Sequence, residues 1–160
     1  MEARTILPTT FMRASLRQLL LALVFIGIVG LEVELALLRH AESVTQWIPH
    51  LALIVGFLTT AAVYFRPGPG TLRAFQLVML IFLVAGALGV YLHIRGNVEF
   101  ALERDPSLSG LKLIWKALRG ATPALAPGAL AQLGLLGFLY TYKHPAFETV
   151  STGQAASVDY

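Results

Sequence analysis

Residues 19–38 read LLLALVFIGIVGLEVELALL, an apolar run interrupted by only two charged side chains, Glu32 and Glu34. A helix with a rise of about 1.5 Å per residue needs about 20 residues to cross a hydrocarbon layer roughly 30 Å thick. The run has this length, and its apolar character resumes after the two glutamates and continues to Leu38. It therefore predicts a membrane-spanning helix.

Three further apolar stretches of similar length follow, at residues 47–65, 74–94 and 123–142. Across the 160 residues, 56% are hydrophobic and 13% are charged, and the mean hydropathy is +0.70. Soluble domains contain about 25% charged residues, so this composition favours a lipid environment. The sequence predicts an all-α fold: an integral membrane four-helix bundle that forms a single domain over residues 1–145 and passes several times through the cell membrane. Residues 146–160 are small and polar, which is typical of a flexible tail.

Composition also excludes several classes of function. The chain contains no cysteine, which rules out disulfides, thiolate metal ligands and cysteine nucleophiles. Its formal net charge is only +3, and the basic residues are spread along the loops instead of forming one stripe. We therefore expect the lipid bilayer, and no nucleic acid, to be the partner of this surface.

The orientation of the bundle depends on loop charges that are evenly divided. An even number of spans places both termini on one side, and six basic residues lie on each side of the predicted bundle. Arg4, Arg13 and Arg17 precede the first span, and the first helix usually dominates the positive-inside rule. This favours cytoplasmic termini.

An amphipathic segment at residues 107–119 separates the third and fourth spans. Apolar residues recur there at helical spacing, while Lys112, Lys116 and Arg119 occupy another face and Trp115 suits the membrane interface. Two arrangements fit this pattern. The short helix either lies flat in the headgroup layer with its basic face toward lipid phosphate, or packs as a lid over the mouth of the bundle.

The two glutamates of the first span are predicted to face opposite ways. At 100° per residue, Gly27, Gly30 and Glu34 share one face, and small residues mark faces where membrane helices approach closely. Glu34 is therefore expected to point into the bundle. Glu32 lies about 160° away, where it either reaches the headgroups near Arg39 or contacts a second subunit.

The third span carries a stripe of small residues that ends in polar ones. Phe82, Gly86, Gly89, His93 and Asn97 follow one another at spacings of three or four. One interpretation is close helix packing with a hydrogen-bonded histidine at the rim. The other is a bound haem between the helices, with His93 and His50 as axial ligands.

A divalent metal is a further candidate ligand. Imidazole and carboxylate side chains suit zinc or iron, and Glu34, His40, His50, His93 and Glu99 all lie toward the same end of the bundle. Their spacing is not diagnostic, because neither a Glu-x-x-His pair nor a His-Glu-x-x-His motif is present. No catalytic residues are predicted. Whether the chain is an enzyme stays open, and the lack of a catalytic constellation in the sequence favours a protein that is not an enzyme.

Helix boundaries at this end follow from the sequence. The third helix is expected to continue beyond the membrane to Arg104, with an Arg95–Glu99 ion pair, and to stop at Asp105-Pro106. The fourth starts either at Thr122-Pro123 or near Pro127. Within it, Gln132 is expected to donate an interhelical hydrogen bond.

Together these features predict a binding or accessory subunit of a membrane assembly, with other membrane subunits or a second copy as partner. The alternative is a redox, metal-binding or haem-binding protein that uses His50, His93, Glu34 and Glu99. A small transporter ranks third, because few polar residues continue through the membrane.

Overall fold

The computed structural model describes residues 9–39, 42–120 and 125–147, with side chains from residue 16 onward. Every regular element in these ranges is helical. In chain order they are α1 (Thr9–Leu37), the 3-10 helix η1 (Val44–Gln46), α2 (Trp47–Phe65), α3 (Pro69–Arg104), α4 (Gly110–Leu118), α5 (Gly128–Thr141) and the 3-10 helix η2 (Pro145–Phe147).

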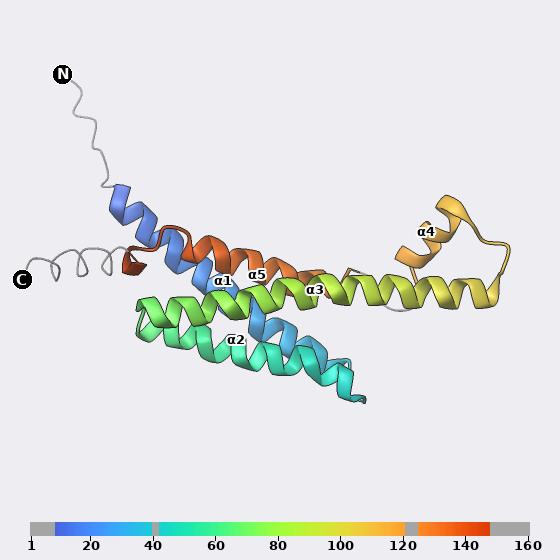
Figure 1. Ribbon diagram of the computed structural model, residues 1–160, viewed down its shortest axis with the longest axis horizontal. Helices are drawn as coiled ribbons and strands as arrows, with labels where there is room; N and C mark the ends of the chain where they lie inside the picture. Colours follow the sequence, from blue (N-terminus) through green and yellow to red (C-terminus); the bar gives the residue numbers. More distant parts are fainter. Residues whose placement is uncertain (1–8, 40–41, 121–124, 148–160) are drawn as a thin grey trace, which may run out of the picture.

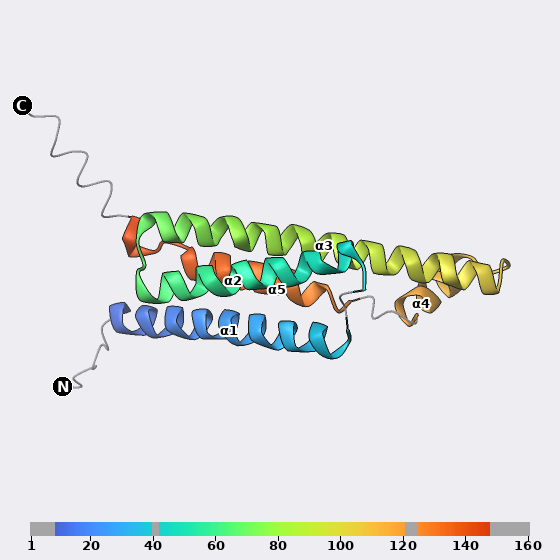
Figure 2. The same ribbon diagram turned by 90° about the horizontal axis from the view of Figure 1, so that it is seen from below.

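Three of the described helical segments are long and apolar enough to cross a membrane. They cover Leu16–Leu37, Val44–Phe65 and Pro69–Arg104. Together with the shorter apolar helix α5 they lie side by side, while α3 continues well beyond the others and carries α4 near its far end (Figures 1 and 2). The all-helical, membrane-compatible class predicted from the sequence is therefore confirmed.

α3 ends where the sequence predicts but begins at Pro69, five residues before the predicted third span. Pro69 occupies the first turn, and the Gly68 amide donates to the Thr71 hydroxyl, with 2.9 Å between nitrogen and oxygen. At the other end the helix stops at Arg104, directly before Asp105 and Pro106. At about 1.5 Å per residue, its 36 residues extend roughly 54 Å, well beyond a hydrocarbon layer of about 30 Å.

The boundaries of α4 and α5 are narrower than predicted. The amphipathic segment expected over residues 107–119 is helical only from Gly110 to Leu118. α5 begins at Gly128, so of the two predicted starts the structure has the one near Pro127; residues 121–124, including Thr122 and Pro123, lie outside the described residues. Of the predicted tail, residues 146 and 147 belong to η2 and the remainder lies outside the described residues.

Close contact between α3 and α5 depends on glycine. An added Cβ at Gly86 would lie 2.5 Å from the Ala131 amide nitrogen and 2.9 Å from the Pro127 carbonyl oxygen. A Cβ at Gly134 would lie 2.6 Å from the Met79 carbonyl oxygen. The small-residue stripe predicted on the third span therefore meets small residues of α5, backbone against backbone.

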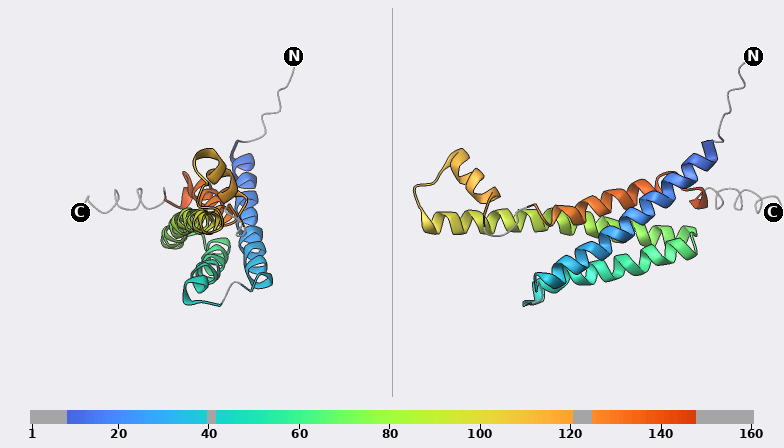
Figure 3. Two further views of the ribbon diagram at one scale, coloured as in Figure 1. Left: turned by 90° about the vertical axis from the view of Figure 1, so that its right-hand side faces the viewer. Right: turned by 180° about the vertical axis from the view of Figure 1, so that it is seen from behind.

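Apolar side chains fill the remaining space between the helices. The largest fully buried ones are Phe75, Phe82, Ile28, Leu53, Leu72 and Met79. α1 crosses the others obliquely, so that it passes over α5 and then over α2 (Figure 3). This crossing decides which α1 side chains face the bundle at each depth.

Candidate functional site

The Glu32 carboxylate and the His50 imidazole are hydrogen-bonded to each other between α1 and α2, at the end of the bundle opposite the start of α1. His50 Nδ1 lies 2.8 Å from Glu32 Oε1, and the histidine side chain is only 7% exposed, against 37% for the glutamate. The second carboxylate oxygen, Oε2, is buried and has no hydrogen-bond partner among the described residues. A carboxylate bound to one imidazole nitrogen fixes the orientation and tautomer of the ring.

The prediction that Glu32 faces away from the bundle is wrong. Leu21, Val24 and Ile28 form the buried stripe of α1, and beyond them the helix leaves α5 and packs on α2. Glu32 lies on the α2 side of this last segment and reaches His50. Gly30 does not mark a packed face of α1, because a Cβ added there would meet no atom within 4 Å.

Glu34 was expected to point into the bundle and Gln132 to bond to a neighbouring helix, and the structure contradicts both predictions. Each side chain is exposed on the surface of the described chain. At 100° per residue, Glu34 lies about 160° around α1 from Glu32, the residue that contacts His50 of α2. Gln132, expected to bond to a neighbouring helix, lies on the exposed side of α5.

The residues proposed as metal ligands do not gather in the part of the chain that the structure describes. No group of three or more His, Cys, Asp or Glu side chains there could hold a metal ion, and His40 lies outside that part. Glu99 is exposed and pairs with Arg95 at 2.8 Å, as predicted. His93 is half-buried on α3, and His50 pairs with Glu32. Haem or metal ligation by His50 and His93 stays a prediction.

α4 packs on the extension of α3 and not as a lid over the bundle mouth (Figures 1 and 2). The buried Asn97 side chain donates from Nδ2 to the Ala117 carbonyl oxygen at 2.9 Å. Gly120 lies so close to the Asn97 amide that a Cβ would overlap it. A polar side chain at the end of the small-residue stripe of α3 thus fixes the position of α4.

A second polar cluster, which the sequence reasoning missed, joins the helices at the other end of the bundle. Arg17 Nη2 donates to the Lys143 carbonyl oxygen at 2.9 Å, linking α1 to the segment after α5. Gln76 Nε2 on α3 donates to the Thr141 hydroxyl at 3.1 Å. The sequence does contain an indication of this cluster. Arg17 and Gln76 lie near the ends of apolar runs, where a polar side chain needs a hydrogen-bond partner.

His144 in this cluster makes stability depend on pH. Burial, followed by the nearby positive charge of Arg17, lowers its pKa from the ordinary value of 6.5, and the Ala146 amide donates to its Nδ1. At a pH above about 6.5 the imidazole is neutral in both states, so the folded protein keeps its full stability. As the pH falls below 6.5, His144 is protonated in the unfolded chain but not yet in the folded protein. Stability therefore falls until the pH reaches the lowered pKa that His144 has in the folded protein.

We therefore expect the unfolding temperature in detergent to fall as the pH is lowered from about 7.5 to about 5. His144→Gln should flatten this dependence, because the titrating group is gone. The measurement is a thermal unfolding series across pH for both proteins. An equally steep dependence in the variant would assign the effect to another group.

Comparison of the chain with protein-family models, with curated proteins and with solved structures finds no match. The class of the protein therefore follows from its own residues. It is a helical protein with three helices long and apolar enough to cross a membrane, polar clusters at both ends of the bundle, and a short amphipathic helix on an extension of α3.

Proposed function

We propose that this chain is a subunit of a membrane assembly and that it binds its partner, another membrane chain or a second copy, along the outer side of the α1/α5 contact. The observation that carries the proposal is the exposure of Glu34 and Gln132, two polar side chains on apolar helices. Ionisable residues in spanning helices almost always face a bundle interior or a water-filled cavity. Their exposure here indicates a surface that another helix covers.

We infer that these side chains belong to one surface. Gly27 of α1 packs against the Leu133 methyl groups of α5. Gly30 and Glu34 follow Gly27 within about 10 Å of helix rise, and Gln132 lies about 100° around α5 from Leu133. From these helical phases, and from the contact of Glu32 with α2, we take all three to lie on the side of the contact away from α2. We call Gly30, Glu34 and Gln132 the polar seam.

The polar seam suits helix association. Gly30 lacks a side chain and has open space above it, so the backbone of another helix can approach closely. Glu34 and Gln132 supply hydrogen-bonding groups, which contribute roughly 0.6–1.7 kcal/mol each between membrane helices. Lipid offers no comparable partner, so covering the seam with a helix of a second subunit lowers its free energy.

The proposal includes four spans, with α5 and the residues before it as the fourth. α5 ends at Thr141, beside the first part of α1, because Arg17 of α1 bonds to Lys143. An even number of spans then places both termini on one side, and the arginines before α1 favour the cytoplasm for that side.

The mass of the protein extracted from its native membrane in mild detergent tests the proposal. We expect a particle larger than the 17.3 kDa chain plus detergent, and we expect replacement of the seam by Glu34→Leu with Gln132→Leu to weaken it about tenfold or more. Mass spectrometry of the particle distinguishes a second copy from a different chain.

A matched variant controls for general effects of changing the lipid-facing surface. Leu58 on α2 and Val84 on α3 are exposed and lie outside the polar seam. Leu58→Ala with Val84→Ala should leave the particle mass unchanged. A wild-type protein that is only monomeric, or an assembly that the seam variant leaves intact, would contradict the proposal.

A further inference from the structure

α4 has three different faces, and two of them are exposed. One face, with Leu113 and Ala117, packs on α3. At 100° per residue, Lys112, Lys116 and Arg119 form a second face about a third of a turn away. The third face is apolar and its side chains are largely exposed: Leu111 (84%), Ile114 (56%), Trp115 (62%) and Leu118 (40%).

The side chains of the basic face border a shallow, open hollow. Lys112, Trp115, Lys116 and Arg119 surround this space of about 440 Å³, with the Arg119 guanidinium 5.6 Å from the centre of the Trp115 ring. α4 itself contains no acidic residue. Asp105, five residues before α4, accepts hydrogen bonds from the Ser107 hydroxyl and amide at 2.6 and 3.1 Å and also interacts with the charge of Lys116. Three like charges at this spacing repel one another, and an anion in the hollow relieves that repulsion.

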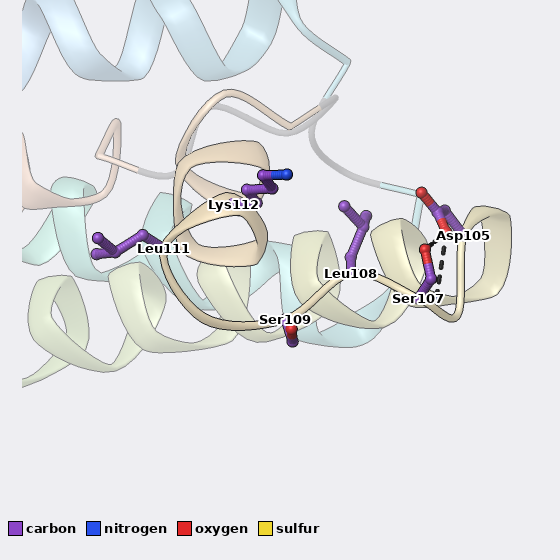
Figure 4. A pocket seen from close by; sticks show the side chains of 6 residues that line it. All are labelled: Asp105, Ser107, Leu108, Ser109, Leu111 and Lys112. Atoms are coloured by element: carbon purple, nitrogen blue, oxygen red, sulfur yellow. Dashed lines mark hydrogen bonds between the residues drawn. The ribbon is translucent and has the colours of Figure 1, made fainter.

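A neighbouring hollow, of about 490 Å³, lies at the start of α4 (Figure 4). Asp105, Ser107 and Ser109 line it together with Leu108, Leu111 and Lys112, and Leu111 points from α4 back toward the spanning part of α3. The mixed lining, with a carboxylate at one side, does not favour an anion. The anionic site is therefore the hollow on the basic face.

The predicted end of the third span puts the C-terminal end of α4 at the level of the headgroups. Ala117 of α4 is bonded to Asn97, which lies three residues, or about 4.5 Å, beyond the end of the predicted third span at Ile94. The headgroup region extends roughly 5–7 Å beyond the hydrocarbon on each side. A free anion would account only for the basic face, whereas a lipid supplies a phosphate for it and acyl chains for the apolar face.

We propose that α4 binds the headgroup phosphate of an anionic phospholipid in the hollow formed by Lys112, Lys116 and Arg119, with Trp115 and the apolar face against the acyl chains. This site lies on the α3 extension and is separate from the polar seam. Either proposal can therefore fail without affecting the other.

Trp115 itself can report the bound lipid. The chain has two tryptophans, so Trp47→Phe leaves Trp115 as the only one. The full-length variant is reconstituted in phosphatidylcholine vesicles that contain a minor fraction of either dibrominated phosphatidylglycerol or dibrominated phosphatidylcholine, whose bromines quench nearby tryptophan. Each cation near an anionic surface favours binding by a factor of about five, so we expect at least a fivefold enrichment of phosphatidylglycerol next to Trp115.

Two further variants assign the effect to the hollow. Lys112→Gln, Lys116→Gln and Arg119→Gln together should abolish the preference but keep quenching by phosphatidylcholine. Arg66→Gln, Arg73→Gln and Lys143→Gln remove three charges at the other end and should leave the preference intact. Absent quenching, equal quenching by the two lipids, or a preference that survives the first triple variant would overturn the proposal. Loss of the preference on adding inorganic phosphate at constant ionic strength would show a site for free anions and overturn it too.

Discussion

Gly86→Ala is expected to lower the free energy of unfolding by about 2–3 kcal/mol, near the upper end for adding one methyl group to a packed interior. The new Cβ would lie 2.5 Å from the Ala131 amide nitrogen and 2.8 Å from the Ala131 Cβ. These atoms belong to or adjoin the backbone of α5, so no side-chain rotation relieves the overlap. α3 and α5 must therefore move apart, which also weakens the contacts that Pro127 and Gly134 of α5 make with α3.

Gly96→Ala on the same helix is the matched control. A Cβ added at Gly96 meets no atom within 4 Å, and alanine favours helix formation over glycine by up to about 1 kcal/mol. Unfolding of both variants in mixed micelles, with increasing denaturing detergent, measures the difference. Equal stability of the two variants would show that α3 and α5 do not approach as closely as described.

Glu32→Ala is expected to cost about 1–3 kcal/mol of stability. Removing one partner of a fully buried ion pair costs roughly 3–5 kcal/mol, and a surface pair contributes about 1 kcal/mol or less. The Glu32 side chain is 37% exposed, so the effect should fall between these limits, while His50 at 7% exposure is left buried without its carboxylate.

The pairing can be isolated with a double-mutant cycle. If the two side chains interact as described, Glu32→Ala combined with His50→Ala should cost less than the sum of the two single changes, by about 1–2 kcal/mol. Glu34→Ala in dispersed detergent is the control and should change stability by no more than about 0.5 kcal/mol, because Glu34 is exposed. Additive effects in the cycle, or a larger loss for Glu34→Ala, would contradict the assignment.

Much of the architecture could be predicted from local sequence patterns. Apolar length identified the long helices, Asp105-Pro106 marked the end of α3, and the Arg95–Glu99 pair followed from helical spacing. The small residues of α3 and α5 also marked a true contact, since Gly86 and Gly134 lie against backbone. Each of these features depends on residues within one or two helical turns or on complementary faces.

The polar residues could not be placed in the same way. Whether Glu32 or Glu34 faces the bundle depends on where the oblique α1 passes from α5 to α2, and no local pattern in the sequence specifies that crossing. Gly30 resembles a packing position although nothing packs on it within the chain. His50 bonds to Glu32, which lies eighteen residues earlier on another helix. The apolar core sets how α1 and α2 are rotated against each other, and so which side chains can meet.

The polar seam can be tested most directly by photo-cross-linking in the native membrane. A photoreactive benzophenone amino acid replaces Gln132 in one protein and Leu58 in another, and both are irradiated before any detergent is added. We predict a discrete protein adduct from position 132 and only lipid labelling from position 58, because Leu58 lies on α2, away from the seam. Lipid labelling alone from both positions would contradict the proposal that this chain is a subunit covered along α1 and α5.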